Sequence, residues 1–107
     1  MLEYYLTGFY GCASGIPDEC KTPLMREMDR LNLFSSPHEI RDYLTVRGDR
    51  RAGESCPVSV HLSRVAPGES PYVGTDAVET PSITYRMSRT LQEFIRRFDA
   101  GAYPELV

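Results

Sequence analysis

The pattern of apolar residues predicts an α+β fold, in which a small antiparallel sheet has helices packed on one of its faces. Alternating apolar and polar residues are typical of half-buried strands, whereas apolar residues three and four positions apart are typical of amphipathic helices. These segments follow one another in the order β-α-α-β-β-α, without the repeated β-α-β units of a parallel sheet. We therefore expect residues 1–107 to form one globular domain that buries a core without needing disulfide bonds.

Local signals predict the first strand and the first two helices. Residues 2–10 are rich in Tyr, Phe and Leu, which favours a strand. Thr22-Pro23 is typical of a helix N-terminus, because Thr caps the helix and Pro fits its first position; this helix is expected to run to about Leu33. Ser36-Pro37 begins a second, short helix in the same way, with a full capping box between Ser36 and Glu39.

Alternation predicts two further strands in the second half of the chain. Residues 58–63 read Val-Ser-Val-His-Leu-Ser, which predicts a half-buried strand. Residues 82–87 alternate in the same way and predict the last strand. A long connection separates the two, and within it Tyr72-Val73 and Ala77-Val78 are candidates for an additional short edge strand.

The last helix is predicted by a stripe of four apolar residues at positions i, i+3, i+4 and i+7. These residues are Leu91, Phe94, Ile95 and Phe98. Gly101 follows the stripe, and glycine readily adopts the left-handed conformation that ends many helices.

Composition and charge exclude several classes of protein. The net charge of −3 argues against a dedicated nucleic-acid-binding domain, since such domains are usually basic. No apolar run approaches the length of a membrane span, and the N-terminus lacks the basic region of a signal peptide. Three cysteines, an odd number, fit a reducing compartment better than a disulfide framework. We therefore expect a cytoplasmic protein with no membrane contact.

Arginine supplies eleven of the twelve basic residues, and the only lysine is Lys21. The planar guanidinium binds carboxylates and phosphates through two parallel hydrogen bonds, which lysine cannot do. A GC-rich genome also favours Arg codons. The excess of arginine over lysine can therefore reflect either the binding of anionic groups or codon usage. The arginines concentrate in residues 26–51 and 86–97, each with acidic neighbours, and many are expected to form local ion pairs of small individual value.

A metal site is one alternative that the sequence leaves open. Four soft ligands are available, the number that a structural zinc ion needs, and they are Cys12, Cys20, Cys56 and His61. Their spacings, C-x7-C and C-x4-H, lack the closely spaced pair that is typical of such sites. We therefore predict no metal and no cofactor, with Cys56 serving as a small buried apolar residue.

Two enzymatic sites are weaker alternatives. Cys12 lies in a Gly-Ser loop, where a thiolate nucleophile would need His38 or His61 as its base, but nothing local supports that pairing. A ribonuclease-like site would combine acid–base transfer with guanidinium groups on neighbouring strands. Its candidates are His61, Arg64, Tyr85 and Arg86.

DNA binding is the stronger alternative function. Residues 22–51 contain two capped helices joined by a short turn, which is the outline of a helix-turn-helix motif. The second helix and the loop after it contribute four arginines. Glu39 and Asp42 lie on that same short helix, however, and would face the phosphates.

The leading hypothesis is a non-enzymatic protein-interaction module. Tyr and Arg are enriched where proteins bind proteins, because they bury a large area at modest entropic cost. The arginines would contact carboxylates of the target, and the acidic residues would contact a basic, nucleic-acid-binding face. The candidate partner-binding residues are Asp18, Glu19, Glu69, Tyr72, Asp76, Glu79, Arg86, Arg89, Arg96 and Arg97.

The small size, acidic charge and lack of a reactive constellation fit an inhibitor or immunity-type protein that occludes a functional surface of a larger target. A phage- or mobile-element-encoded inhibitor of a bacterial defence nuclease is one concrete form of this hypothesis. The identity of the partner and the oligomeric state stay open.

Overall fold

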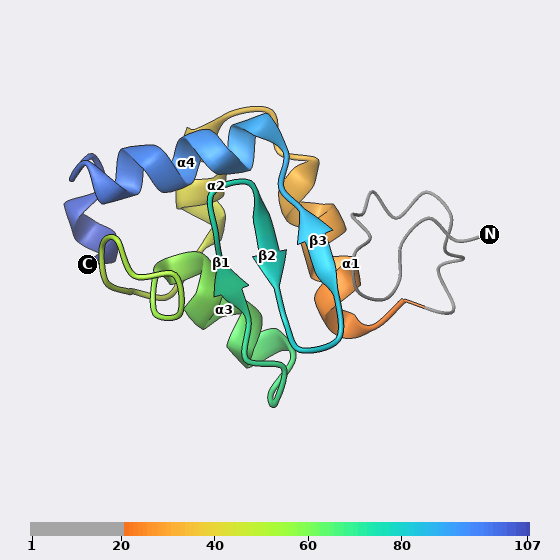
Figure 1. Cartoon of the computed structure of the whole chain (residues 1–107). Helices are drawn as coiled ribbons and strands as arrows, with labels where there is room; N and C mark the ends of the chain where they lie inside the picture. The colour runs from red at the N-terminus through yellow and green to blue at the C-terminus, as the bar shows by residue number, and fades with distance from the viewer. Residues whose placement is uncertain (1–20) are drawn as a thin grey trace.

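Four α-helices and a three-stranded antiparallel sheet make up the part of the chain that the structure describes, residues 21–107 (Figure 1). The structure is a computed structural model. It confirms the α+β fold with a small antiparallel sheet. The strand predicted at residues 2–10 lies outside the described residues, as do Cys12, Cys20, Asp18 and Glu19.

The elements follow one another in the order α1, α2, α3, β1, β2, β3, α4, and a short 3₁₀ helix, η2, comes after them. The helices are α1 (Pro23–Asn32), α2 (Pro37–Tyr43), α3 (Pro57–Val65), α4 (Arg89–Asp99) and η2 (Pro104–Leu106). The strands are β1 (Tyr72–Val73), β2 (Ala77–Glu79) and β3 (Thr84–Arg86).

The N-termini of α1 and α2 form as the sequence predicts. Thr22 Oγ1 accepts a hydrogen bond from the backbone N–H of Met25 at 3.2 Å, and Pro23 occupies the first turn of α1. Ser36 Oγ accepts from the N–H of Glu39 at 3.3 Å. The capping box predicted for α2 is only half formed, because the Glu39 carboxylate accepts from the N–H of Ser35, at 2.9 Å, instead of that of Ser36.

The strand predicted at residues 58–63 is wrong, because this segment lies within helix α3. Val58 and Leu62, four residues apart, are both fully buried on one face of the helix. Ser59 is also fully buried, and its hydroxyl donates to the Pro71 carbonyl oxygen at 2.9 Å. In a strand, Ser59 and Val58 would point to opposite faces, and Ser59 would lie on the polar one. Burial of both residues therefore fits a helix and not a half-buried strand.

The segment expected to add one short edge strand contributes two strands, β1 and β2, and these form the sheet with the last predicted strand; β2 is its central strand and not an edge. Their order is β1-β2-β3, with Tyr72 opposite Glu79 and Val78 opposite Tyr85. Since side chains alternate across a strand, Val73, Val78 and Tyr85 share the buried face. In Figure 1 the sheet lies in front of α1 and α3, while α4 crosses one end of its strands.

Asn32, at the end of α1, holds that helix against the junction of β3 and α4. Its side-chain amide donates to the Arg86 carbonyl oxygen at 3.0 Å, and its oxygen accepts from the N–H of Ser88 at 2.8 Å. Ser88 in turn caps α4 by accepting from the N–H of Leu91 at 3.0 Å. The end of one helix therefore fixes the start of another that lies 56 residues later.

Helix α4 confirms the prediction made from its apolar stripe. Leu91, Phe94 and Phe98 are fully buried, and the Phe94 ring stacks on Tyr103 with 5.2 Å between centroids. Gly101 has a φ of +92°, the left-handed conformation expected of a residue that ends a helix. The chain then turns back, so that residues after α4 pack against the same core.

Candidate functional site

A pocket of about 290 Å³ lies between residues 51–53, strand β1 and helix α4. Its apolar lining includes Cys56, Val73 and Ile95, and its polar lining includes Arg51, Arg96, Asp99, Gln92 and Thr75. Tyr72 stands at the pocket with 49% of its surface exposed. The site therefore joins a partly apolar hollow, an exposed aromatic ring and two guanidinium groups.

The edge of the pocket is built by a close approach between Gly53 and strand β1. The Gly53 carbonyl oxygen accepts from the N–H of Val73 at 2.8 Å. A Cβ at residue 53 would lie 2.6 Å from the Val73 carbonyl oxygen and 2.6 Å from the Tyr72 ring, so only glycine fits here. This contact occupies the outer edge of β1, which would otherwise present unpaired backbone groups.

Arg51 adopts a backbone conformation that is uncommon for a residue with a side chain. Its φ is +57°, in the left-handed region that glycine and asparagine favour. The Asp99 carboxylate, at the end of α4, accepts a hydrogen bond from the Arg51 N–H at 2.7 Å. The backbone of Arg51 is therefore held against the end of α4, and Arg51 lines the pocket.

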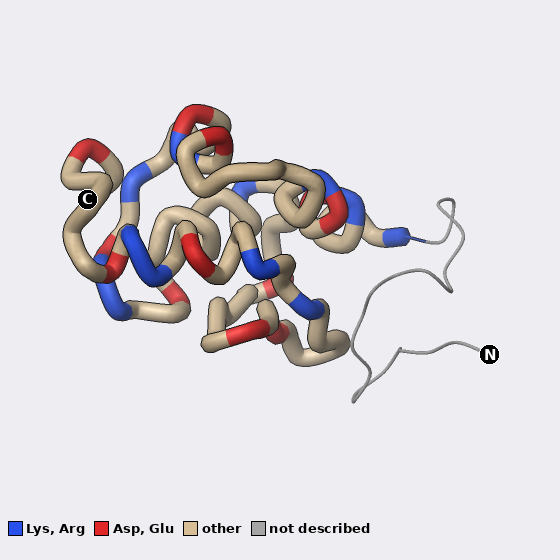
Figure 2. The backbone as a smooth tube through the Cα atoms, turned by 90° about the horizontal axis from the view of Figure 1, so that it is seen from above, with Lys and Arg blue, Asp and Glu red and all other residues tan. Residues whose placement is uncertain are grey.

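The arginines around this pocket differ in their partners. Arg96 pairs with Glu93, one turn earlier on α4. Among residues 21–107 no ion pair involves Arg47, Arg50 or Arg51, and Arg50 and Arg51 line a second, polar hollow next to the pocket. Figure 2 shows acidic and basic residues interspersed along the backbone.

The Cys56 thiol lies at the pocket, but its environment suppresses nucleophilic reactivity. Cys56 is only 2% exposed, and burial raises the pKa of its thiol. The negative charge of the nearby Asp99 carboxylate also raises this pKa. A thiol with a raised pKa stays protonated near neutral pH, and the protonated form is a poor nucleophile. His61 does not line the pocket, so it does not supply a base to this thiol there.

His61 belongs to a separate buried cluster that joins three helices. Its Nε2 lies 2.7 Å from Glu27 Oε2 of α1, and the same oxygen accepts a hydrogen bond from Tyr43 of α2 at 2.6 Å. Burial opposes ionisation of Glu27, but the hydrogen bonds from Tyr43 and His61 and the charges of His61 and Arg30 outweigh it and lower the pKa of Glu27. Burial, together with the same carboxylate, raises the pKa of Tyr43.

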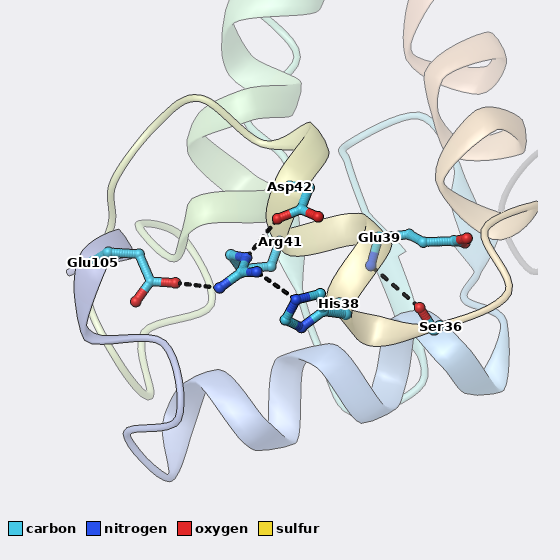
Figure 3. Close-up of polar contacts among 6 residues, drawn as sticks. All are labelled: Ser36, His38, Glu39, Arg41, Asp42 and Glu105. Atoms are coloured by element: carbon cyan, nitrogen blue, oxygen red, sulfur yellow. Dashed lines mark hydrogen bonds and ion pairs between the residues drawn. The ribbon is translucent and has the colours of Figure 1, made fainter.

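Arg41 forms a second polar network, which ties α2 to the C-terminal 3₁₀ helix (Figure 3). Its Nη1 donates to Glu105 at 3.0 Å and its Nε to Asp42 at 2.8 Å. Its Nη2 also donates to His38 Nε2 at 2.5 Å. With three of its nitrogens engaged, Arg41 serves to hold these segments together.

The ribonuclease-like arrangement expected from the sequence is not formed. His61 and Arg64 lie on helix α3, whereas Tyr85 lies on strand β3 and donates its hydroxyl hydrogen to Asp29. His61 is instead bound to Glu27. This weaker alternative assumed that residues 58–63 form a strand next to residues 82–87, and the first of these segments is a helix.

Among residues 21–107 no three His, Cys, Asp or Glu side chains are arranged to hold a metal ion. The candidate ligands Cys12 and Cys20 lie outside this part of the chain. Of the other two, Cys56 lines the pocket and His61 contacts Glu27.

The structure brings some of the predicted partner-binding residues together. Tyr72 and Arg96 both line the pocket. Tyr72 also shares one face of the sheet with Glu79 and Arg86, through the strand register. The remaining described candidates, which do not line the pocket, are Glu69, Asp76, Arg89 and Arg97.

Sequence reasoning missed Arg51, Asp99 and Gln92 as members of one site. The sequence shows a polar loop at residues 47–54, but not that Gly53 bonds to β1 or that Asp99 binds the backbone of residue 51. The glycine at position 53 was the available signal, because glycine is often used where the backbone approaches another group closely.

No helix in residues 21–107 combines the length and the apolar composition needed to cross a membrane. Comparisons of the chain with family models, curated proteins and solved structures found no match.

Proposed function

We propose that this protein is a non-enzymatic interaction module, and that it binds a larger protein at the pocket beside β1. The observation that carries the proposal is the placement of Tyr72, half exposed, next to a pocket lined by Arg51 and Arg96. Tyr and Arg dominate the residues that contribute most to binding at protein interfaces. A side chain of the partner that fills the pocket would bury the Tyr72 ring and exclude water from the two guanidiniums.

The rigidity of the site supports this proposal. Residues 51 and 53 are held by two hydrogen bonds, one of 2.7 Å from the Arg51 N–H to the Asp99 carboxylate and one of 2.8 Å from the Val73 N–H to the Gly53 carbonyl oxygen. A site that is held in its binding conformation loses little conformational entropy when the partner docks, so more of the contact energy appears as affinity. The left-handed Arg51 backbone fits the same interpretation, because uncommon backbone conformations are often found at ligand-binding positions.

The chemistry of the site favours binding over cysteine catalysis. The raised pKa of the Cys56 thiol disfavours the thiolate, and the imidazole of His61 is bound to Glu27.

In its specific form, the proposal is an inhibitor or immunity-type protein of the cytoplasm that occludes a functional surface of its target. A phage- or mobile-element-encoded inhibitor of a bacterial defence nuclease remains one concrete form. DNA binding through residues 22–51 is less favoured, because α2 has only seven residues, Glu39 and Asp42 are exposed on it, and Arg41 is already engaged.

Site-specific cross-linking followed by hydrogen exchange tests this proposal. Tyr72 is replaced by a photo-reactive phenylalanine analogue in the native cell, and Arg64, exposed on α3 and outside the pocket, is replaced in a matched control. The cross-linked protein is identified, produced separately and mixed with this chain. We expect amide protection in the complex at residues 51–53 and at β1.

Protection confined to α2, or cross-links from position 64 as strong as those from position 72, would contradict the proposal. Binding to random DNA duplex that weakens steeply with salt, without a protein partner, would favour the regulator hypothesis instead.

A further inference from the structure

We infer that the partner presents an acidic segment, in which one apolar side chain enters the pocket and neighbouring carboxylates bind Arg51 and Arg96. This inference rests on the proposed function and names the chemistry of the partner. It depends on three properties of the site: the distribution of its charge, its size and lining, and the hydrogen bond that already occupies the edge of β1.

The charge around the pocket favours carboxylates. The guanidinium of Arg51 has no ion-pair partner in residues 21–107, and the adjoining hollow is lined by Arg50, Arg51 and one acidic residue, Asp49. Among the acidic residues of 21–107, Asp99 alone lines the pocket itself, and its carboxylate already accepts the Arg51 N–H. Arg96 shares Glu93 with Arg97, so its charge is only partly compensated. A guanidinium left unpaired at a rim is satisfied best by a carboxylate that accepts two parallel hydrogen bonds.

The size and lining of the pocket favour one apolar anchor. A hollow of about 290 Å³ lined by Cys56, Val73 and Ile95 accommodates a side chain such as leucine. Removing the apolar surface of that side chain from water favours binding. The polar groups at the rim then orient the segment around this anchor.

The β1 edge excludes the usual alternative, in which a peptide adds a strand to the sheet. The N–H of Val73 already donates to the Gly53 carbonyl oxygen at 2.8 Å, so it is not available to an incoming strand. Recognition at this site therefore depends on side chains, and the sequence of the partner segment determines its affinity.

A peptide titration followed by amide chemical shifts tests the inference. The probe is the acetylated, amidated pentapeptide Asp-Glu-Leu-Asp-Glu, added to the full chain. One control peptide has glycine in place of leucine, and a second has lysine at all four charged positions. We expect saturable shifts at Gly53, Val73 and Ile95 for the probe, with affinity at least about ten-fold weaker for each control.

Two variants sharpen the test without disturbing the fold. Arg51→Asn removes the guanidinium of residue 51, and asparagine tolerates the left-handed backbone at this position. Arg96→Gln removes the guanidinium of residue 96. Each is expected to weaken probe binding by about ten-fold, and the matched control Arg64→Gln is expected to leave it unchanged. Unfolding by urea confirms that every variant is folded.

Equal binding of the probe and the lysine peptide, or of the probe and the glycine peptide, would overturn the inference. The inference would also be overturned if the site bound inorganic phosphate but did not bind the probe. The affinity of the native partner for the variants distinguishes this inference from the proposed function. If its affinity depends on Tyr72 but not on Arg51 or Arg96, the inference fails and the proposed function stands. If it binds away from the pocket, the proposed function fails even where the probe binds.

Discussion

The arginines of this chain fall into two groups according to their ion-pair partners. Arg30, Arg41, Arg96 and Arg97 pair with carboxylates, as the sequence predicts from acidic neighbours. Most of these pairs are solvent-exposed and contribute little to stability each. The loop arginines, Arg50 and Arg51, have no ion pair in residues 21–107. Arg47, Arg64 and Arg89 have no ion pair in these residues either, so Arg51 is distinguished by its place at the pocket and not by the lack of a partner alone.

Glu27 is the buried residue on which stability depends most directly through charge. Its side chain is 10% exposed and connects α1, α2 and α3 through Tyr43 and His61. Because its pKa lies below 4.5, the value expected in the unfolded chain, the ionised form stabilises the fold. That contribution is fully present above about pH 4.5 and is lost as the pH falls through the folded-state pKa.

Replacing Glu27 by glutamine tests this contribution. At pH 7 we expect Glu27→Gln to lower the free energy of unfolding by about 1–3 kcal/mol, because hydrogen bonds to a charged acceptor are lost. Urea unfolding at several pH values should show the gap between the two proteins narrowing below about pH 4.5. Glu54→Gln, at an exposed position, is the control. A gap that stays constant across this range would show that the charge of Glu27 does not stabilise the fold.

Gly53 offers a second test, at the edge of the pocket. Gly53→Ala places a Cβ against Val73 and Tyr72, and we expect a loss of about 1–3 kcal/mol in the free energy of unfolding. At Gly74 the nearest atom, the Ala77 carbonyl oxygen, lies 3.3 Å from an added Cβ, so Gly74→Ala is the milder control. Equal stability of the two variants would mean that the close approach of residue 53 to β1 is not formed.

Helix α3 shows how a short segment can satisfy two periodicities. The alternation in residues 58–63 fits a strand, but Val58 and Leu62 also lie four residues apart, as on one helical face. Pro57 is the signal that distinguishes the two, since proline is favoured at the first position of a helix, as at Pro23 and Pro37.

Substitutions at neighbouring positions of α3 distinguish helix from strand in solution. Ser59 is fully buried and Val60 half-buried, the reverse of the strand pattern. We expect Ser59→Leu to lower the free energy of unfolding by about 1–3 kcal/mol through overpacking and loss of the bond to Pro71. Val60→Thr should cost at most about 1 kcal/mol. A larger loss for Val60→Thr, measured by urea unfolding, would support a strand.

The other elements were predictable because their signals are local. Capping at Thr22, Ser36 and Ser88 starts three helices, and the apolar stripe of α4 needs no tertiary information. The position of α3 relative to the sheet was not predictable, because it depends on contacts such as that of Ser59 with Pro71. Sequence patterns specify which face of an element is apolar, but not which partner covers it.

The whole molecule is acidic, with a net charge of −3, whereas the lining of the proposed docking site includes two arginines, Arg51 and Arg96, and one acidic residue, Asp99. Only Tyr72 and Arg96 of that site were predicted from the sequence as partner-binding residues. The rest of the pocket forms when residues 51–53 close onto β1 and the end of α4, three segments that are distant in the chain. A site made by such closure leaves no contiguous motif, which is why sequence reasoning found its parts and not their arrangement.

The affinity of the purified partner for the wild type, Tyr72→Ala and Arg64→Ala tests the central claim most directly. Because Tyr72 is half exposed beside the pocket, its removal should cost about 2 kcal/mol or more of binding energy. The Kd should then rise at least about thirty-fold, while Arg64→Ala leaves it unchanged. Equal Kd values for all three proteins, each shown to be folded, would contradict the assignment of the pocket beside β1 as the docking site.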